Sequence, residues 1–159
     1  MKVAAKPAVL FVCLGNICRS PLAEAAFRYE AARLSLGVEA ASAGTGGWHI
    51  GEAPDRRAQA VAKRHGIDIS FYRARQVTAQ DFQRYSHIVA LDSENLKVLN
   101  AMRPVEGTAA LSLLLDHVAG REGEGVADPY YRDMAEFERT WAEVTAGAQA
   151  LARRLLEET

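Results

Sequence analysis

The feature that most constrains this chain is residues 9–21, where an apolar run ends in a cysteine and passes through a short loop into a stretch with helical patterning. Val9–Val12 has the apolar, partly β-branched composition of a buried strand, and Cys13 ends it. Gly15 and Asn16 follow, and both residue types tolerate left-handed backbone dihedrals, so the loop can curl with its N–H groups facing inward. The segment therefore predicts a strand, a curled loop and a helix.

The helix that follows this loop is expected to bind an anion. Its first N–H groups have no partner within the helix and carry partial positive charge, which favours a phosphate or another oxyanion at this end. Ser20 is a good N-cap whose hydroxyl can also point into the loop, and Pro21 suits the first helical position. We therefore predict a phosphate-binding loop directly after the first strand.

Two side chains give the loop a chemistry beyond binding. Cys13 lies at its base, where a helix N-terminus and a nearby guanidinium should favour the thiolate at neutral pH. Arg19 follows after five intervening residues, and its planar fork matches two phosphoryl oxygens. Taken alone, Cys13 would be a small buried hydrophobe and Arg19 a solvated charge. Their conjunction with this loop predicts phosphoryl transfer to sulfur.

Length and charge limit the classes of protein to which the chain can belong. Its 159 residues suffice for one sizeable core, so we expect one domain over residues 1–159. A net charge of −1 gives no general basic surface, which argues against nucleic acid or an anionic membrane as a main partner. Lys2–Leu14 is too short for a signal peptide and lacks a credible cleavage site, and no apolar run is long enough to span a membrane. We expect a cytoplasmic protein.

The two cysteines, Cys13 and Cys18, lie in the same loop and so do not cross-link distant parts of a secreted fold. Their spacing is not C-x-x-C and the four histidines are scattered, so no metal site is predicted. Two states of Cys18 stay open. It either packs beneath the loop or forms a reversible disulfide with Cys13 that protects the nucleophile from irreversible oxidation.

The rest of the chain alternates strands with helices. The expected strands are Val38–Ala43, His87–Asp92 and Leu111–Leu115, and the expected helices are Leu22–Leu36, stopped by Gly37, then Pro54–His65, Ser93–Met102 and a last helix from about Asp133. A strand, a helix and a second strand in this order predict a parallel pair with a right-handed crossover. Open parallel sheets bind ligands beyond the carboxyl ends of their strands, which is where Cys13 lies.

Two residues on other loops complete the candidate site. Trp48 lies in a glycine-rich loop that leaves the same sheet edge, and its indole could form one wall of a slot for a flat ring; a Trp folded back on the core is the alternative. Asp128, followed by Pro129, is the best-placed general acid, because the neighbouring tyrosines can shield it and raise its pKa. A turn-forming Asp before Pro is the alternative here. Asp92 is expected to cap a helix.

Cys13–Pro21 (CLGNICRSP) near the N-terminus and Asp128–Tyr131 (DPYY) near the C-terminus together resemble the low-molecular-weight protein tyrosine phosphatases. The resemblance extends to chain length, Ser42–Gly44, the Trp48 loop and Ala74–Gln76, and so covers nearly the whole chain. It implies a single α/β domain whose four-stranded parallel sheet is flanked by helices on both faces. It also implies a metal-free phosphatase that needs no cofactor.

The same resemblance implies a two-step mechanism. Cys13 would attack phosphorus while Arg19 and the loop amides bind the three equatorial oxygens. Asp128 would protonate the departing phenolate and then act as the base for the water that hydrolyses the cysteinyl phosphate. Ser20 would hydrogen-bond the thiolate and improve it as a leaving group, and Asn16 would tie the left-handed turn of the loop to neighbours such as the serine of the Ser-Ala-Gly stretch.

The resemblance also implies which residues bind the substrate. They are Leu14, Gly15, Asn16, Ile17, Cys18, Ser20, Trp48 and Tyr130. Trp48 and Tyr130 would form the walls of a deep slot that admits phosphotyrosine and leaves phosphoserine too short to reach Cys13. The implied partners are phosphotyrosine-containing proteins, with a tyrosine kinase among the candidates, and inorganic phosphate or other oxyanions in the loop.

One departure from the family pattern and three rival functions remain. Many relatives carry a His where this chain has Tyr72, so the support of Asn16 is expected to differ. Related arsenate reductases relay electrons through further cysteines, and this chain has none after Cys18. Arginine phosphatases of the family typically carry Thr at the place of Ile17. A phosphotyrosine-binding module would not need the nucleophile, the clamp and the acid together.

Overall fold

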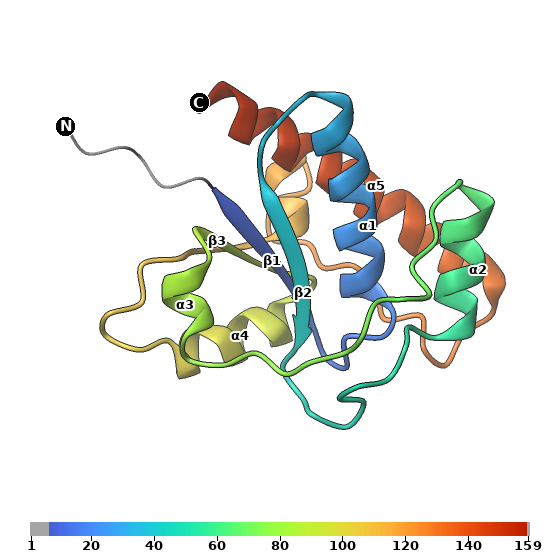
Figure 1. Cartoon of the computed structure of the whole chain (residues 1–159), viewed down its shortest axis with the longest axis horizontal. Helices are drawn as coiled ribbons and strands as arrows, with labels where there is room; N and C mark the ends of the chain where they lie inside the picture. The colour runs from blue at the N-terminus through green and yellow to red at the C-terminus, as the bar shows by residue number, and fades with distance from the viewer. Residues whose placement is uncertain (1–6, 159) are drawn as a thin grey trace.

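A computed structural model describes residues 7–158 of the chain as strands alternating with helices (Figure 1). The elements are β1 (Ala8–Cys13), α1 (Arg19–Arg33), β2 (Glu39–Gly44), α2 (Arg56–Arg64), α3 (Asp81–Arg84), β3 (His87–Ala90), α4 (Ser93–Met102), β4 (Ala110–Leu113), the 3-10 turn η1 (Leu114–His117) and α5 (Met134–Glu157). Positions 1–6 and 159, which belong to the expected domain 1–159, lie outside the described residues. The expected α/β fold is confirmed, with four parallel strands in the order β2-β1-β3-β4.

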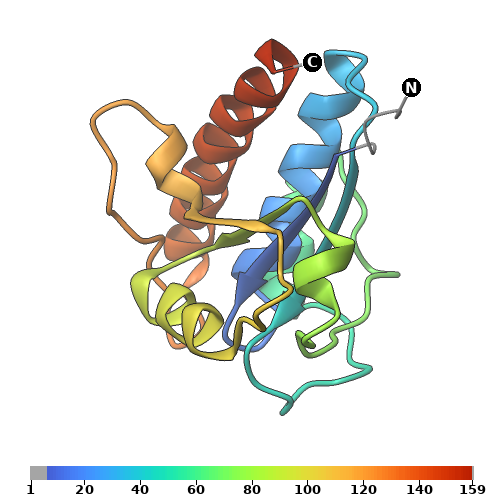
Figure 2. The same cartoon turned by 90° about the vertical axis from the view of Figure 1, so that its left-hand side faces the viewer.

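Helices cover both faces of this sheet. α1 and α5 run side by side along one face, and α4 packs against β3 and β4 on the other (Figures 1 and 2). Side chains along β1 alternate between the two faces. Phe11 and Cys13 belong to the core beneath α1 and α5, whereas Leu10 and Val12 belong to the core beside α4. Because β1 is buried on both faces, its sequence is a continuous apolar run.

The order of the strands determines where in the fold the candidate site lies. The chain forms β2 on one side of β1 and then crosses to form β3 on the other side. The connections that leave β1 and β3 therefore diverge at the carboxyl edge, where open α/β sheets bind ligands. Cys13 ends β1 at this edge. Asp92 follows β3 there and caps α4 by accepting a hydrogen bond from Asn95 N at 2.8 Å, as the sequence predicted.

Helix α1 begins earlier than predicted. Its first residue is Arg19 and Cys18 occupies the cap position without a side-chain cap bond, so the prediction of Ser20 as the N-cap is wrong. Pro21 consequently lies third in the helix instead of first. The Ser20 hydroxyl is bonded within the loop, at 3.0 Å from Cys13 Sγ, which explains why it does not cap the helix.

Helix α1 also ends earlier than predicted, at Arg33, and Gly37 is not its stop. Ser35 adopts the left-handed conformation, with φ of 53°. Ser35 N donates to Ala32 O at 3.1 Å and Leu36 N donates to Ala31 O at 2.8 Å, which is the Schellman pattern of helix termination. Leu36 is buried because it packs back on the helix in this motif, which mimics helical spacing in the sequence.

The other boundaries differ by a few residues from the prediction. The fourth strand ends at Leu113, because the Asp116 carboxylate accepts a hydrogen bond from Leu113 N at 2.9 Å and starts η1. The third strand ends at Ala90 instead of at the expected Asp92. The short helix α3 was not predicted. None of these differences moves Cys13 away from the carboxyl edge of the sheet.

The described residues contain neither a membrane-spanning helix nor a group of side chains suited to a metal ion. Between residues 7 and 158, no helix has both the length and the apolar character needed to cross a membrane. In the same residues, no three His, Cys, Asp or Glu side chains are grouped closely enough to hold a metal ion.

Gly147→Ala is expected to destabilise the protein, although alanine is the better helix former by about 1 kcal/mol. Gly147 lies in α5 against fully buried Leu114, and a Cβ at this position would overlap the Leu114 side chain. Such overpacking costs about 1–3 kcal/mol. The free energy of unfolding in urea should therefore fall. As a control, Ala142→Gly on the exposed face of α5 should lose about 1 kcal/mol through helix propensity alone. A more stable Gly147→Ala protein would contradict the tight packing.

Candidate active site

Asn16 fixes the conformation of the loop between β1 and α1. Its φ of 59° is left-handed, whereas Gly15 does not use the left-handed freedom that was expected of it. Asn16 Nδ2 donates to Ser20 Oγ at 2.8 Å and to Ser42 Oγ at 3.0 Å. Asn16 Oδ1 accepts from Arg75 N at 3.0 Å. One buried amide thus joins the loop to α1, to β2 and to the segment after α2, and the predicted contact with Ser42 is confirmed.

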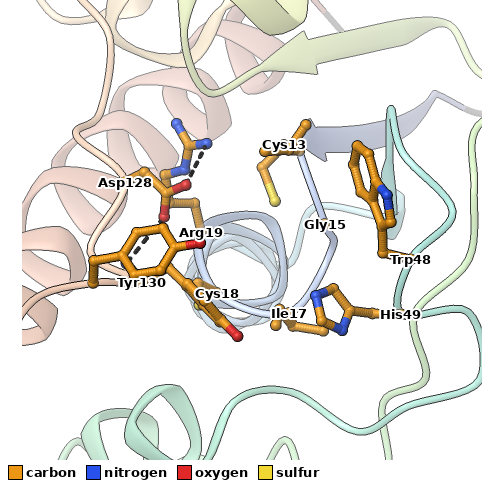
Figure 3. Close-up of a pocket in the computed structure, with 11 residues that line it drawn as sticks. Cys13, Gly15, Ile17, Cys18, Arg19, Trp48, His49, Asp128 and Tyr130 are labelled. Carbon is orange, nitrogen blue, oxygen red and sulfur yellow. Dashed lines mark hydrogen bonds and ion pairs between the residues drawn. The ribbon is translucent and has the colours of Figure 1, made fainter.

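Cys13 lies at the base of this loop. Its side chain is buried, and its Sγ points into the cavity between Trp48 and Arg19 (Figure 3). Cys13 Sγ is 3.0 Å from Ser20 Oγ. Asn16 donates to Ser20 Oγ, so the Ser20 hydroxyl proton can be donated to the sulfur or to Ala43 O, which is 3.4 Å away. The geometry matches the hydrogen bond from Ser20 to Cys13 that the resemblance implied.

Arg19 is a buried cation, with 3% of its surface exposed. Its Nη1 donates to Asp92 Oδ2 at 2.6 Å and to Val126 O at 3.0 Å, and its Nη2 lies 3.6 Å from Asp128 Oδ2. Burial alone would lower the pKa of Arg19, but Cys13, Asp92 and Asp128 together raise it above its usual value. The guanidinium is therefore held in the charged form beside the sulfur, oriented by Asp92.

Asp128 lies across the cavity from Trp48, on the segment that precedes α5 (Figure 3). Its Oδ1 accepts a hydrogen bond from Tyr130 N at 3.1 Å, which closes a short turn. Asp128 Oδ2 lies 3.6 Å from Arg19 Nη2, so the carboxylate stands at the cavity beside the guanidinium. Its side chain is 42% exposed, so the neighbouring tyrosines do not shield it as the sequence reasoning expected. The turn and the catalytic interpretations of Asp128 are therefore compatible.

These residues surround a cavity of about 290 Å³. Its lining is formed by Cys13, Leu14, Gly15, Ile17, Cys18, Arg19, Trp48, His49, Asp128, Tyr130 and Tyr131. Trp48 and Tyr130 stand on opposite sides of the loop (Figure 3). Trp48 is 71% exposed, so it is not folded back on the core. Its ring lies against Gly46, where any Cβ would overlap the indole.

Two predicted substrate-binding residues lie behind the cavity. Asn16 and Ser20 do not line it, and their side chains bond to the loop from beneath. Cys18 does line it and is buried, and this burial, with smaller contributions from Asp55 and Cys13, raises the pKa of the Cys18 thiol far above its usual value. Both cysteines are free in this structure. Cys18 is thus a protonated thiol packed in the loop.

Tyr72 is not one of the residues that hydrogen-bond the Asn16 side chain. The partners of the Asn16 side chain are Ser20, Ser42 and the Arg75 main chain. Ser42 in turn donates to Glu24 Oε1 at 2.7 Å. Burial raises the pKa of Tyr72 to about 12, with the Glu24 charge as the second cause. The support of the Asn16 side chain therefore comes from these three partners, and Ser42 is itself bonded to Glu24.

Three residues that contribute to this site were not predicted from the sequence. Asp92 was assigned only the cap of α4, although it also pairs with Arg19. Its position after β3, at the point where the loops diverge, was a signal that could have identified it. His49 lines the cavity beside Trp48, and its Nδ1 is 3.1 Å from Glu52 Oε2. Tyr131 also lines the cavity and is almost fully exposed.

Comparisons with known proteins agree with this geometry. The sequence profile described as low molecular weight phosphotyrosine protein phosphatase matches residues 8–159. The low molecular weight protein-tyrosine-phosphatase YfkJ of Bacillus subtilis is 42% identical over 152 residues, which cover 94% of this chain and 96% of that protein. The low molecular weight phosphotyrosine protein phosphatase of Homo sapiens is 38% identical over 157 residues, covering 97% and 99%.

Solved structures give the same result. The crystal structure of YfkJ from Bacillus subtilis superimposes with a TM-score of 0.90 at 40% identity and covers 98% of each chain. A protein tyrosine phosphatase from Entamoeba histolytica, crystallised with Hepes in its active site, superimposes with a TM-score of 0.89 at 31% identity and covers 96% of this chain and 98% of its own. The chain therefore belongs to the low molecular weight phosphotyrosine protein phosphatase family.

Proposed function

We propose that this protein hydrolyses phosphotyrosine monoesters in proteins through a cysteinyl-phosphate intermediate. The observation that supports this most is the convergence of Cys13, Arg19 and Asp128 on one cavity beneath two aromatic walls. Membership of the phosphatase family supports the same activity. The enzyme acts as a single domain over residues 1–159 in the cytoplasm, needs no cofactor, and its partners are phosphotyrosine proteins, a tyrosine kinase among the candidates.

In the first step the Cys13 sulfur attacks phosphorus, and the bond from phosphorus to the phenolic oxygen breaks. The three equatorial oxygens rest on the curled loop, where its N–H groups and the Arg19 fork neutralise the developing charge. Asp92 holds Nη1 of Arg19, which leaves Nη2 directed at the cavity beside Asp128. Asp128 gives its proton to the phenolic oxygen. Phosphate is then bound covalently to sulfur.

In the second step water attacks the cysteinyl phosphate and Asp128, now ionised, takes a proton from this water. The sulfur leaves as a thiolate. The Ser20 hydroxyl, 3.0 Å from Cys13 Sγ, stabilises this charge by donating a hydrogen bond to it. Inorganic phosphate then leaves the loop, and Cys13 returns to its starting state.

The walls of the cavity favour an aromatic ester. A phenyl ring between Trp48 and Tyr130 would bury apolar surface on both faces and bring its phosphate to the loop. Ile17 adds an apolar side chain to the same slot. A phosphoserine side chain is too short to span from the exposed rim to Cys13. A phosphoarginine would bring a charged guanidinium into an apolar slot and lose its hydration there.

A side-by-side assay of phosphotyrosine, phosphoserine and phosphoarginine peptides in excess chelator tests the substrate class. We expect hydrolysis of the phosphotyrosine peptide at the rate seen without chelator, because no step uses a metal ion. The other two peptides should react at least about 100-fold more slowly in kcat/KM, as expected when the reacting group is not held in position. Faster hydrolysis of the phosphoarginine peptide, or loss of activity with chelator, would contradict the proposal.

Asp128→Ala should slow the cleavage of a phosphotyrosine peptide by about 10²–10⁴-fold, the usual contribution of a general acid. An aryl phosphate with a strongly acidic phenol should be affected far less, because its leaving group needs no proton. Steady-state kcat/KM for both substrates measures the difference. Glu106→Ala, an exposed carboxylate before β4 at the opposite edge of the sheet, is the matched control and should leave both values unchanged. Equal effects on both substrates would remove Asp128 from the acid role.

A further inference from the structure

The segment that carries Asp128 contacts the rest of the protein mainly through side chains: Pro129 is buried, Tyr130 packs against the core, and Asp128 lies beside Arg19. Val126 is buried and Val126 N donates to Leu91 O at 2.7 Å, so the chain is fixed up to this point. From there residues 127–132 cross the rim of the cavity to reach α5. Their internal bonds, such as Arg132 N to Pro129 O at 2.8 Å, close a turn without fastening it to the rest of the protein.

Arg57 in the first turn of α2 supplies this attachment. Its Nη1 donates to Arg132 O at 2.7 Å and its Nη2 donates to Tyr130 O at 2.8 Å. Within residues 7–158, these two bonds are the ones that join the main chain of residues 127–132 to another element. The guanidinium also lies over the ring of Phe137 in α5, at 4.6 Å from the ring centre. Arg57 therefore holds the turn that follows Asp128 at two of its carbonyl groups.

Arg57 is itself held in place by Asp55. Arg57 Nε and Nη2 donate to the two carboxylate oxygens of Asp55 at 3.0 and 2.9 Å, a bidentate pair. Burial would raise the pKa of Asp55, but its hydrogen bonds with Arg57 lower the pKa below its usual value, so the pair is charged at neutral pH. Asp55 N donates to Ile17 O in the phosphate-binding loop at 2.9 Å. One chain of bonds thus connects this loop to the segment of Asp128.

We propose that Arg57 is a positioning residue that holds Asp128 over the substrate's leaving oxygen. A general acid works only within hydrogen-bond reach of the atom that it protonates, and an error of about 1 Å can cost about 100-fold in rate. Two charge-assisted bonds to the Tyr130 and Arg132 carbonyls fix the main chain of this turn, which among the described residues has no other main-chain hydrogen bond to another element. Because Asp55 N is bonded to Ile17 O, the position of the turn is tied to the position of the loop that binds the phosphate. This inference rests on the proposed acid role of Asp128.

The test measures kcat/KM of Arg57→Ala with two aryl phosphates, one with a weakly acidic phenol and one with a strongly acidic phenol. We expect a loss of about 10- to 100-fold for the first substrate and less than about threefold for the second, because only the first needs the acid. Arg57→Lys keeps the charge but loses the fork, so it should recover part of the loss and provides a second, milder variant if Arg57→Ala folds poorly. Arg56→Ala removes the same charge from the exposed side of the same turn and should change neither value.

A double-mutant cycle with Asp128→Ala separates positioning from a merely structural role. Once the acid is gone, Arg57→Ala should cause no further loss with the weakly acidic phenol. Equal losses with both phenols, or losses that multiply in the double variant, would overturn the proposal for Arg57 while leaving the acid in place. If Asp128→Ala alone does not discriminate between the phenols, the acid role fails and the proposal for Arg57 fails with it.

Discussion

The structure depends on a positive charge buried at the carboxyl edge of the sheet. The Arg19 guanidinium is nearly inaccessible to water, and a buried cation is stable only when its hydrogen bonds are matched by partners of opposite charge or by carbonyl oxygens. Asp92 and the Val126 carbonyl meet this requirement on one nitrogen. The remaining side of the guanidinium faces the cavity, with Nη2 3.6 Å from Asp128 Oδ2. In the proposed reaction, this side of the guanidinium would bind the phosphoryl oxygens of the substrate.

The strand order makes that arrangement possible. Arg19 follows β1 and Asp92 follows β3, and these neighbouring strands end where their connections turn in opposite directions. The same edge receives Trp48 from the loop after β2 and Asp128 from the segment before α5. Asn16 prevents the phosphate-binding loop from relaxing, since its amide is bonded to three separate parts of the chain. In the proposed reaction, a rigid loop with preformed donors would need little reorganisation as charge develops on the phosphoryl group.

The sequence was most informative where the chemistry is local. Cys13, Asn16 and Arg19 lie within seven consecutive positions, so their spacing alone indicates a strand, a loop and a helix that together bind an anion. The family resemblance then supplied the four-stranded sheet and both cavity walls. Partners that are distant in sequence were not predicted. Arg19 and Asp92 are 73 positions apart, and nothing in the local pattern around Asp92 distinguishes a helix cap from a helix cap that also orients an arginine.

Local patterns also misled where tertiary contacts compete with them. Ser20 has the preferred chemistry of an N-cap, yet its hydroxyl is bonded to Cys13 and Asn16 instead. Leu36 fits helical spacing but packs in a Schellman turn beyond the helix. The tyrosines next to Asp128 suggested shielding, but the turn leaves the carboxylate exposed. In each case the local preference was real and a contact from elsewhere in the fold decided the outcome.

The proposed mechanism requires that the sulfur of Cys13 becomes bonded to phosphorus during turnover. The most direct measurement is mass spectrometry of the protein after rapid acid quenching of its reaction with an aryl phosphate. We expect one added phosphoryl group on the peptide that contains Cys13, formed within the first turnover and absent from Cys13→Ala. A fully active enzyme with no phosphoryl group on this peptide, or with the group on another residue, would contradict it.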